Sequence, residues 1–257
     1  MYGAIIGDLA GSIYEYEQTK GIKSVVIDRI IPENAFYSDD TILTIAVTDA
    51  ILHDKDYEKF LKMYIDKYKD YKPNFNPYFK LSFSPGLIRW ANGKREGNST
   101  GNGAMMRISP VGYMFDKKID VLENARLATI PSHNSEEALA SATTVALLIY
   151  YFRYGFTKEE VLDRFKFDLK YHPFDRFNTT CNETIDNCLY SIFNTNSFDE
   201  SIKEVISYGG DTDTNACIVG SISESLYGAE KELIQKADEK LPNEFVKVLR
   251  KSNYRNF

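Results

Sequence analysis

The opening segment of the chain places glycine at every fourth position, Gly3, Gly7 and Gly11, and this repeat constrains the fold more than any other feature. Residues four apart lie on the same face of an α-helix, so the three glycines would form one stripe. Each glycine inside a helix costs about 0.5–1 kcal/mol relative to alanine. The stripe therefore predicts a helix that another backbone approaches very closely.

Most of the remaining sequence also has helical patterns with recognisable starts and stops. Asn134 followed by Glu137 is a predicted capping box before the apolar run Leu139–Phe152. Thr157 caps a second helix in the same way, and Gly155 between the two is predicted to end the first. The amphipathic, highly charged segments expected on the outside are Asp56–Tyr71, Ala229–Lys240 and Pro242–Lys251.

Signals for strands and long loops are few. The β-branched run Ser24–Ile31 is the best candidate strand, and Pro32 would end it. Tyr71–Ser84 and Gly93–Gly103 are predicted loops. A loop as long as Gly93–Gly103 inside a compact domain is often functional. No βαβ alternation indicates a parallel sheet. We therefore predict one all-α domain over residues 1–257, with few or no strands.

Two short acidic clusters each precede an apolar helix. Ser38-Asp39-Asp40-Thr41 leads into residues 42–52, and Gly209-Gly210-Asp211-Thr212-Asp213-Thr214 leads into residues 215–227. Helix capping alone would explain one carboxylate in such a place. Two neighbouring acids repel each other, and burial increases the repulsion. Because the pattern occurs twice, we predict that the two clusters share bound cations.

The donor atoms in these clusters indicate which cations are expected. They are nearly all oxygens, which favours magnesium, manganese or calcium over zinc. Four aspartates and Glu15 suffice for a pair of ions. Glu15 lies seven residues after Asp8, so both are predicted near one face of the first helix. Two alternatives remain: the two acids form a pair on the protein surface, or Glu15 lies beside a functional site at the C-terminal end of that helix.

A third motif runs from Ser99 to Gly112 and contains Gly101-Asn102-Gly103. Asn-Gly flanked by glycine predicts a turn with positive φ angles, whose exposed N–H groups are able to bind an anion. A helix is expected to begin near Ala104. His133 precedes the predicted cap at Asn134, a position where histidine is more often structural than catalytic.

Composition excludes several other classes of protein. The net charge of -6 over 257 residues gives no basic field for a stable nucleic-acid partner. The three cysteines form no Cys-x-x-Cys pair, and the three histidines lack metal-ligand spacing. The longest apolar run, around 142–152, is shorter than the roughly 18 residues of a membrane span. With no basic leader at the N-terminus, we expect a cytoplasmic monomer without a membrane partner.

Taken together, these segments resemble the ADP-ribosylglycohydrolase family, which includes the dinitrogenase-reductase-activating glycohydrolases and the ADP-ribosyl-acceptor hydrolases. The likeness covers nearly the whole chain in the family's order. It rests on Gly3 to Glu15 as the opening helix, Ser38–Thr41 and Gly209–Thr214 as metal motifs, and Gly101–Gly112 as the central loop. Each motif is modest alone, but four in this order are highly specific.

The resemblance implies an orthogonal helical bundle with a binuclear site of two Mg²⁺ or Mn²⁺ ions. Ser38, Asp39 and Asp40 match ligands of one ion, Asp211 and Thr214 match ligands of the other, and Asp213 lies near both. Glu15 and Asp40 match catalytic positions, with Glu15 as the group that activates water. The implied substrate-binding residues are Gly86, Gly101, Asn102, Gly103, Met105 and His133.

The implied activity is hydrolysis at the anomeric carbon of the distal ribose, which releases ADP-ribose. The acceptor would be a protein, a nucleic acid or a small molecule, held by the aromatic-rich segments Pro73–Phe83 and Asp168–Asn178. Two other interpretations stay open: a member that binds ADP-ribose or serves a structural role without catalysis, and a two-metal phosphodiester hydrolase. The complete acidic set favours activity, because buried acids without a cation are costly.

Overall fold

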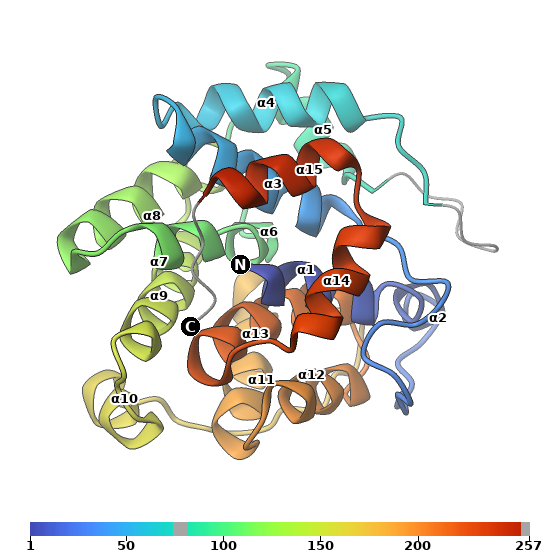
Figure 1. The fold of residues 1–257 in the computed structure, drawn as a ribbon. Helices are drawn as coiled ribbons and strands as arrows, with labels where there is room; N and C mark the ends of the chain where they lie inside the picture. Colours follow the sequence, from blue (N-terminus) through green and yellow to red (C-terminus); the bar gives the residue numbers. More distant parts are fainter. Residues whose placement is uncertain (74–81, 253–257) are drawn as a thin grey trace.

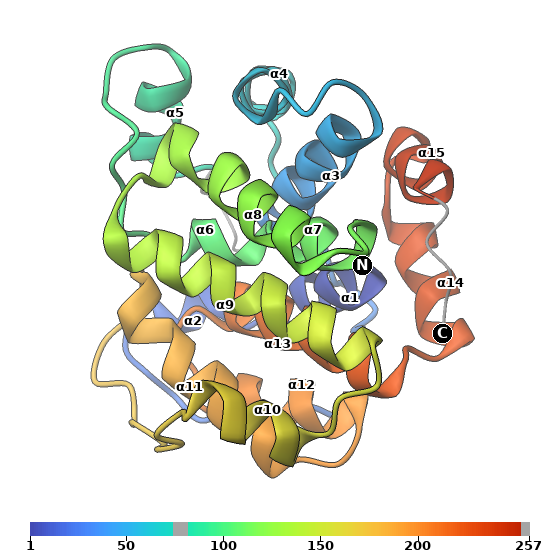
Figure 2. The same cartoon turned by 90° about the vertical axis from the view of Figure 1, so that its left-hand side faces the viewer.

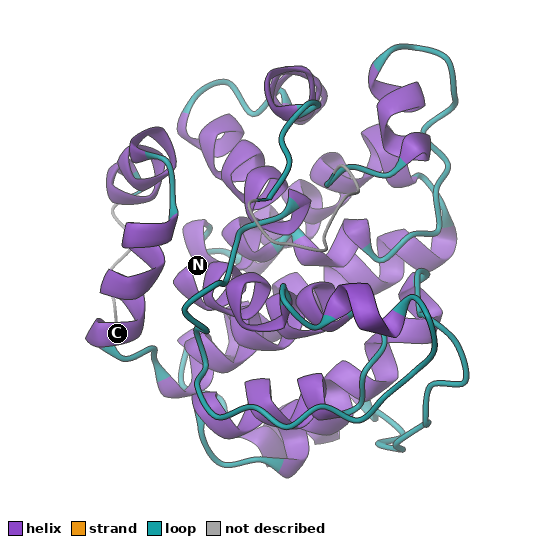
Figure 3. Ribbon diagram, turned by 90° about the vertical axis from the view of Figure 1, so that its right-hand side faces the viewer, coloured by secondary structure: helices purple, strands orange, loops and turns teal. Residues whose placement is uncertain are grey.

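The computed structural model describes residues 1–73 and 82–252, and the ordered elements within them are helices (Figures 1 and 3). No strand occurs in these two ranges, where pairing is limited to isolated bridges of Asn98 with His133 and Gly101 with Thr180. The all-α prediction is therefore confirmed. The helices are α1 (Tyr2–Gly11), α2 (Glu15–Gln18), α3 (Asp39–Leu52), α4 (Tyr57–Tyr68), α5 (Pro85–Ala91), α6 (Gly103–Met106), α7 (Ser109–Met114), α8 (Lys118–His133), α9 (Glu136–Arg153), α10 (Lys158–Phe165), α11 (Cys181–Asn194), α12 (Phe198–Ser207), α13 (Thr212–Tyr227), α14 (Lys231–Lys240) and α15 (Asn243–Lys251).

Helices α1 and α13 form the centre of the molecule, and the other helices surround them (Figures 1 and 2). All ten residues of α1 are buried, as are most of those of α13. The surrounding layers include α3, α4 and α15 on one side and α11 and α12 on the other. Helices α8 and α9 pack against each other across the face seen in Figure 2.

The glycine stripe of α1 lies against α13, as its spacing predicted. A Cβ atom added at Gly3, Gly7 or Gly11 would lie 2.1, 2.0 or 2.2 Å from the carbonyl oxygens of Gly220, Ala216 and Thr212. The order of these contacts makes the two helices antiparallel. The C-terminal end of α1 therefore meets the N-terminal end of α13, where the second acidic cluster lies.

Local capping explains several helix boundaries. Thr157 and Glu160 form the predicted capping box of α10, and Gly155 ends the preceding segment with φ of +79°. The predicted start of α9 is wrong by one residue, since Ser135, not Asn134, caps it by accepting from the Ala138 N–H. Pro242 precedes α15 instead of opening its first turn.

Two other predictions are wrong. Residues 24–31 form no strand, because no other strand in the described part of the chain pairs with them; Val26 is 87% exposed while Ile27, Ile30 and Ile31 are buried. The first helix also does not reach Glu15: α1 ends at Gly11, and Glu15 begins α2. Part of the predicted loop 71–84 lies outside the described residues. No helix in the described ranges is both long and apolar enough to cross a membrane.

Candidate active site

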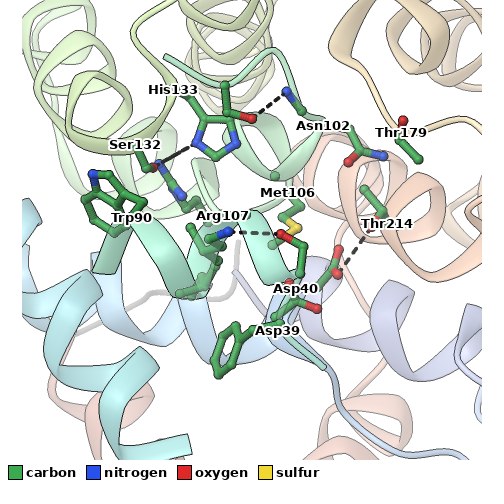
Figure 4. Close-up of a pocket in the computed structure, with 18 of the residues that line it drawn as sticks. Asp39, Asp40, Trp90, Asn102, Met106, Arg107, Ser132, His133, Thr179 and Thr214 are labelled. Atoms are coloured by element: carbon green, nitrogen blue, oxygen red, sulfur yellow. Dashed lines mark hydrogen bonds between the residues drawn. The ribbon is translucent and has the colours of Figure 1, made fainter. Parts of the chain in front are cut away.

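The two acidic clusters meet at one end of a cavity of about 950 Å³. Helix α3 begins at Asp39 and α13 at Thr212, so both clusters occupy helix N-termini. Thr214 Oγ1 donates to Asp40 Oδ2 at 3.3 Å, which joins the two clusters directly (Figure 4). The acidic residues that line this end are Glu15, Asp39, Asp40, Asp211 and Asp213.

Asp8 of α1 lies beneath this acidic end and organises the first cluster. It accepts hydrogen bonds from the backbone N–H groups of Ser38 and Thr41 at 2.9 and 3.1 Å, and from their hydroxyls at 2.8 and 2.5 Å. Ser38 Oγ also lies 3.1 Å from Asp40 Oδ2. A carboxylate so fully engaged with its own protein is suited to positioning the cluster more than to binding a ligand.

The carboxylates of the clusters lie close enough to share cations. One carboxylate oxygen from each of Asp8, Asp40 and Asp213 lies within 4.8 Å of the others, and the same holds for Glu15, Asp211 and Asp213. Asp213 belongs to both groups. Asp40 Oδ1 and Asp213 Oδ1 are buried and accept no hydrogen bond from the described residues. Buried carboxylate oxygens normally have a partner, so these two atoms fit the role of metal ligands.

Three carboxyl groups at the acidic end have raised pKa values, and burial is the largest cause in each case. Burial raises the pKa of Asp8 from 3.8 to about 6, although hydrogen bonds from Thr41 and Ser38 oppose the change. Burial, followed by repulsion from Asp8, Asp39 and Asp211, raises the pKa of Asp40 well above its usual value. The pKa of Asp213 is raised in the same way, by burial and then by Glu15 and its other acidic neighbours. A divalent cation would supply the missing charge.

Asn102 connects the acidic end to the central loop. Its side-chain amide donates to Asp211 Oδ2 at 2.7 Å, and the N–H of Asp211 donates to Asn178 Oδ1 at 2.8 Å. The predicted turn with positive φ at Gly101-Asn102-Gly103 is wrong, since Asn102 has φ of −62° and neither glycine has positive φ. Positive φ occurs instead at Gly209 and Gly210, both at 74°, just before α13.

The predicted glycines of the cavity wall leave room beside neighbouring side chains because they have no side chain of their own. A Cβ at Gly101 or Gly103 would lie 3.5 Å from His133 Nε2, and a Cβ at Gly86 would lie 2.5 Å from Arg95 Nη1. Gly86, Gly101, Gly103 and His133 all line the cavity.

Met105, one of the predicted substrate-binding residues, does not line the cavity. Its side chain is fully buried in the hydrophobic core, whereas that of Met106 lines the cavity. The short helix α6 turns neighbouring side chains in different directions, which decides between the two methionines. Ser38 also does not line the cavity, because its hydroxyl faces Asp8 and Asp40.

The end of the cavity away from the carboxylates carries residues that sequence reasoning missed. Arg107 and Ser132 lie beside His133, as Figure 4 shows, and the exposed Arg89 and Arg95 line the same cavity, as does Trp90. A charged residue inside the apolar stretch 104–111 was the signal for Arg107. Of the predicted acceptor-facing segments, Phe83 and Phe177 line the cavity, and residues 74–81 lie outside the described part of the chain.

Comparison with known proteins gives the same family from the sequence, and a solved structure shares the fold. Residues 1–254 match the model of the ADP-ribosylglycohydrolase family. ADP-ribosylhydrolase ARH3 of Mus musculus is 24% identical, over 89% of this chain and 83% of that protein. The putative ADP-ribosyl glycohydrolase L543 of Acanthamoeba polyphaga mimivirus is 24% identical, over 88% of this chain and 84% of that protein. A solved structure titled "ADP-ribosylglycohydrolase-related protein complex" aligns with a TM-score of 0.75 at 18% identity, over 98% of this chain and 95% of that one.

Proposed function

The chain belongs to the ADP-ribosylglycohydrolase family, and from that premise we propose that it releases ADP-ribose from an ADP-ribosylated acceptor with the help of two divalent cations. The bond cleaved is the one at the anomeric carbon of the distal ribose. The observation that carries the proposal is the acidic end of the cavity, where Asp40 and Asp213 each have a buried oxygen with no partner among the described residues.

The residues present fit a pair of Mg²⁺ or Mn²⁺ ions. Asp39 and Asp40, with Ser38 at the back of the cluster, would hold one ion; Asp211 and Thr214 would hold the other, and Asp213 would contact both. All of these groups offer oxygen, as hard cations require. Bound there, the cations would hold the two vicinal hydroxyls of the distal ribose and neutralise the carboxylates.

The protein's own groups then account for the hydrolysis. Asp40 and Asp213 fix the orientation of the ribose from the floor of the cavity, which lowers the entropic barrier. Glu15, buried at the first residue of α2, accepts a proton from the attacking water. The water oxygen bonds to the anomeric carbon as the bond to the acceptor breaks. Oxocarbenium character develops on the ribose as the acceptor leaves with the bonding electrons, and the proton held by Glu15 passes to the acceptor, which restores the carboxylate.

The rest of the ligand would extend along the cavity away from the carboxylates. Gly101 and Gly103 leave room beside His133, and Gly86 leaves room beside Arg95. The positive charge of Arg89 and Arg95 on this wall suits the two phosphates of ADP-ribose. The acceptor is an ADP-ribosylated protein, nucleic acid or small molecule, and it would enter past Phe83 and Phe177.

Calorimetry with ADP-ribose is the experiment that tests this proposal. We expect binding in the presence of Mg²⁺ and a large loss of affinity after chelation. Asp163→Ala on the exposed face of α10 is the matched control and should bind normally. Absence of binding in both conditions would remove ADP-ribose as the product.

Product analysis separates the proposal from its alternatives. Incubation with ADP-ribosylated arginine, serine and nucleic-acid substrates should yield free ADP-ribose. AMP and ribose phosphate as products would instead identify a phosphodiester hydrolase. Tight binding of ADP-ribose without turnover of any substrate would indicate a member that binds but does not catalyse.

A further inference from the structure

Arg107 is a buried cation that the proposed reaction leaves without a role. Its side chain is fully buried in the wall of the cavity. In the described ranges no carboxylate forms an ion pair with it, and its Nε and Nη1 atoms have no hydrogen-bond partner there. Burial lowers its pKa to about 10, so the guanidinium remains charged at neutral pH. An unpaired buried charge is costly and therefore calls for an explanation.

The one nitrogen of Arg107 that does form hydrogen bonds connects it to His133. Nη2 donates to Ser132 Oγ at 2.7 Å and to the Ala128 carbonyl at 3.3 Å, and it lies 3.5 Å from His133 Nδ1. Ser132 Oγ lies 2.8 Å from the same Nδ1 (Figure 4). Ser132 Oγ is therefore the nearer of two groups that face the Nδ1 atom of His133.

Counting hydrogen atoms decides which way the contact between Ser132 and His133 runs. Ser132 Oγ already accepts from Arg107, and its own hydrogen has Nδ1 as its acceptor. If Nδ1 carried a proton instead, the serine hydrogen would have no acceptor among the described residues, and Arg107 Nη2 would face another N–H. Nδ1 is therefore the acceptor, and the ring proton of neutral His133 resides on Nε2.

We propose that Arg107 and Ser132 are positioning residues that hold His133 as the neutral tautomer with its proton on Nε2, so that it presents an N–H donor to the ligand in the cavity. The inference rests on the proposed function for the identity of that ligand, ADP-ribose. The acceptor would be one of its oxygens. A histidine that alternated between tautomers would offer a donor only part of the time.

The surroundings of Nε2 fit this role. The atom faces Gly101 and Gly103, whose lack of a side chain leaves room beside it in the cavity that His133 lines. The charged and titratable groups around it are Arg107, Arg95, Glu96 and Cys181. Burial, followed by the charges of Arg107 and Arg95, lowers the pKa of His133 well below its usual value. The arrangement therefore keeps the ring neutral as well as oriented.

Nitrogen-15 NMR of the histidine rings tests the inference in the protein without ligand. The chain has only three histidines, and His133→Gln identifies the signals of His133. We expect the pattern of the neutral tautomer protonated on Nε2, unchanged as the pH falls from 8 to about 6, the usual range of histidine titration. Ser132→Ala should produce a mixture of tautomers, and Ser132→Thr should restore the single one. Ser221→Ala, which removes another buried hydroxyl away from the cavity, is the matched control.

Affinity supplies the second readout. Ser132→Ala should weaken ADP-ribose binding about tenfold, a loss typical of one well-made hydrogen bond, while Ser221→Ala should not. Arg107→Met should weaken ADP-ribose binding further. Because that variant replaces a buried cation and its folding is at risk, Ser132→Ala is the variant that decides the outcome.

A wild-type ring protonated on Nδ1, or charged at neutral pH, would overturn the inference, and so would a Ser132→Ala variant with an unchanged tautomer. Failure of ADP-ribose to bind the wild type, with the tautomer as expected, would instead overturn the proposed function, so the two failures are distinguishable.

Discussion

The two ends of the cavity carry side-chain charges of opposite sign. At one end lie five acidic residues, and Asp40 and Asp213 among them each have a buried oxygen without a hydrogen-bond partner in the described ranges. At the other, Arg107 is buried without a carboxylate partner in the described ranges, and Arg89 and Arg95 add positive charge at the wall. Under the proposed function, cations would occupy the acidic end and the phosphates of ADP-ribose would lie toward the other end.

The ends also differ in how they are held. The acidic end rests on backbone contact between α1 and α13 and on the four hydrogen bonds accepted by Asp8. The other end rests on side-chain hydrogen bonds among Arg107, Ser132 and His133, at the end of α8. The first arrangement fixes the charges rigidly in place, whereas the second fixes the direction of one donor. Changes at the two ends should therefore have different consequences.

The largest effect is expected from removing the carboxylate common to both acidic groups. Asp213→Ala should lower kcat by at least about 10³-fold in Mg²⁺, since several kcal/mol of charge stabilisation and substrate orientation depend on it. Asp40→Ala should do nearly as much. Steady-state kinetics with an ADP-ribosylated substrate measures both, with Asp163→Ala as the control. Full turnover by both variants would refute the metal-dependent mechanism.

A smaller effect should follow from Glu15→Gln, which keeps the shape of the side chain and removes its basicity. We expect kcat to fall about 10²-fold or more, because general-base catalysis typically contributes that much, while the affinity for ADP-ribose is retained. Parallel kinetics and calorimetry separate the two quantities. If affinity is lost together with Mg²⁺ binding, Glu15 is a metal ligand and not the base.

Removing the cations should expose the repulsion at the acidic end as a dependence of stability on pH. The folded-state pKa of Asp8 is about 6 against 3.8 in the unfolded chain, and those of Asp40 and Asp213 are also raised. The folded state then binds more protons, so the stabilising contribution of Asp8 is complete below pH 3.8 and is lost as the pH rises through about 6, and those of Asp40 and Asp213 change in the same direction. With chelator, the Tm should be about 5–10 °C lower at pH 7.5 than at pH 5 from this contribution.

Mg²⁺ at pH 7.5 should restore most of that loss, because binding to the folded state alone stabilises it. The same scans on Asp213→Asn provide the check, since removing one negative charge should raise the Tm in chelator and reduce the response to Mg²⁺. A Tm that does not depend on pH with chelator present would contradict the interpretation of the cluster.

The smallest effects should come from two glycines that support the two ends separately. A Cβ at Gly7 would lie 2.0 Å from the Ala216 carbonyl oxygen, and one at Gly97 would lie 1.8 Å from the Pro131 carbonyl oxygen, two residues before His133. Each alanine variant should cost about 1–3 kcal/mol by overpacking. Gly7→Ala should mainly weaken the response to Mg²⁺, and Gly97→Ala should mainly weaken ADP-ribose affinity.

Gly155→Ala serves as the control for both, because it has positive φ but no atom within 4 Å of the added Cβ. Thermal unfolding and calorimetry measure all three variants. Equal effects of Gly7→Ala and Gly97→Ala on both ligands would show that the ends are not supported independently.

The sequence predicted the parts of this molecule that depend on local rules. Helix periodicity and caps identified most helices, and the spacing of glycine predicted the close contact of α1 with another helix. Paired acids before apolar helices pointed to the acidic end of the cavity. The errors arose where a partner decides the conformation: residues 24–31 have strand-forming residues but no strand to pair with, and Asn102 adopts φ of −62° as it bonds Asp211.

By itself, then, the sequence determined that the chain is helical, that α1 needs a backbone neighbour, and that two helix N-termini carry acids. Only the tertiary structure decided that α13 is that neighbour, that Met106 and not Met105 faces the cavity, and that Arg107 and Ser132 reach His133. The physical reason is the distance along the sequence over which each interaction acts. Caps and periodicity act within a few residues, whereas burial of a charge and the direction of a hydrogen bond depend on groups that are distant in sequence.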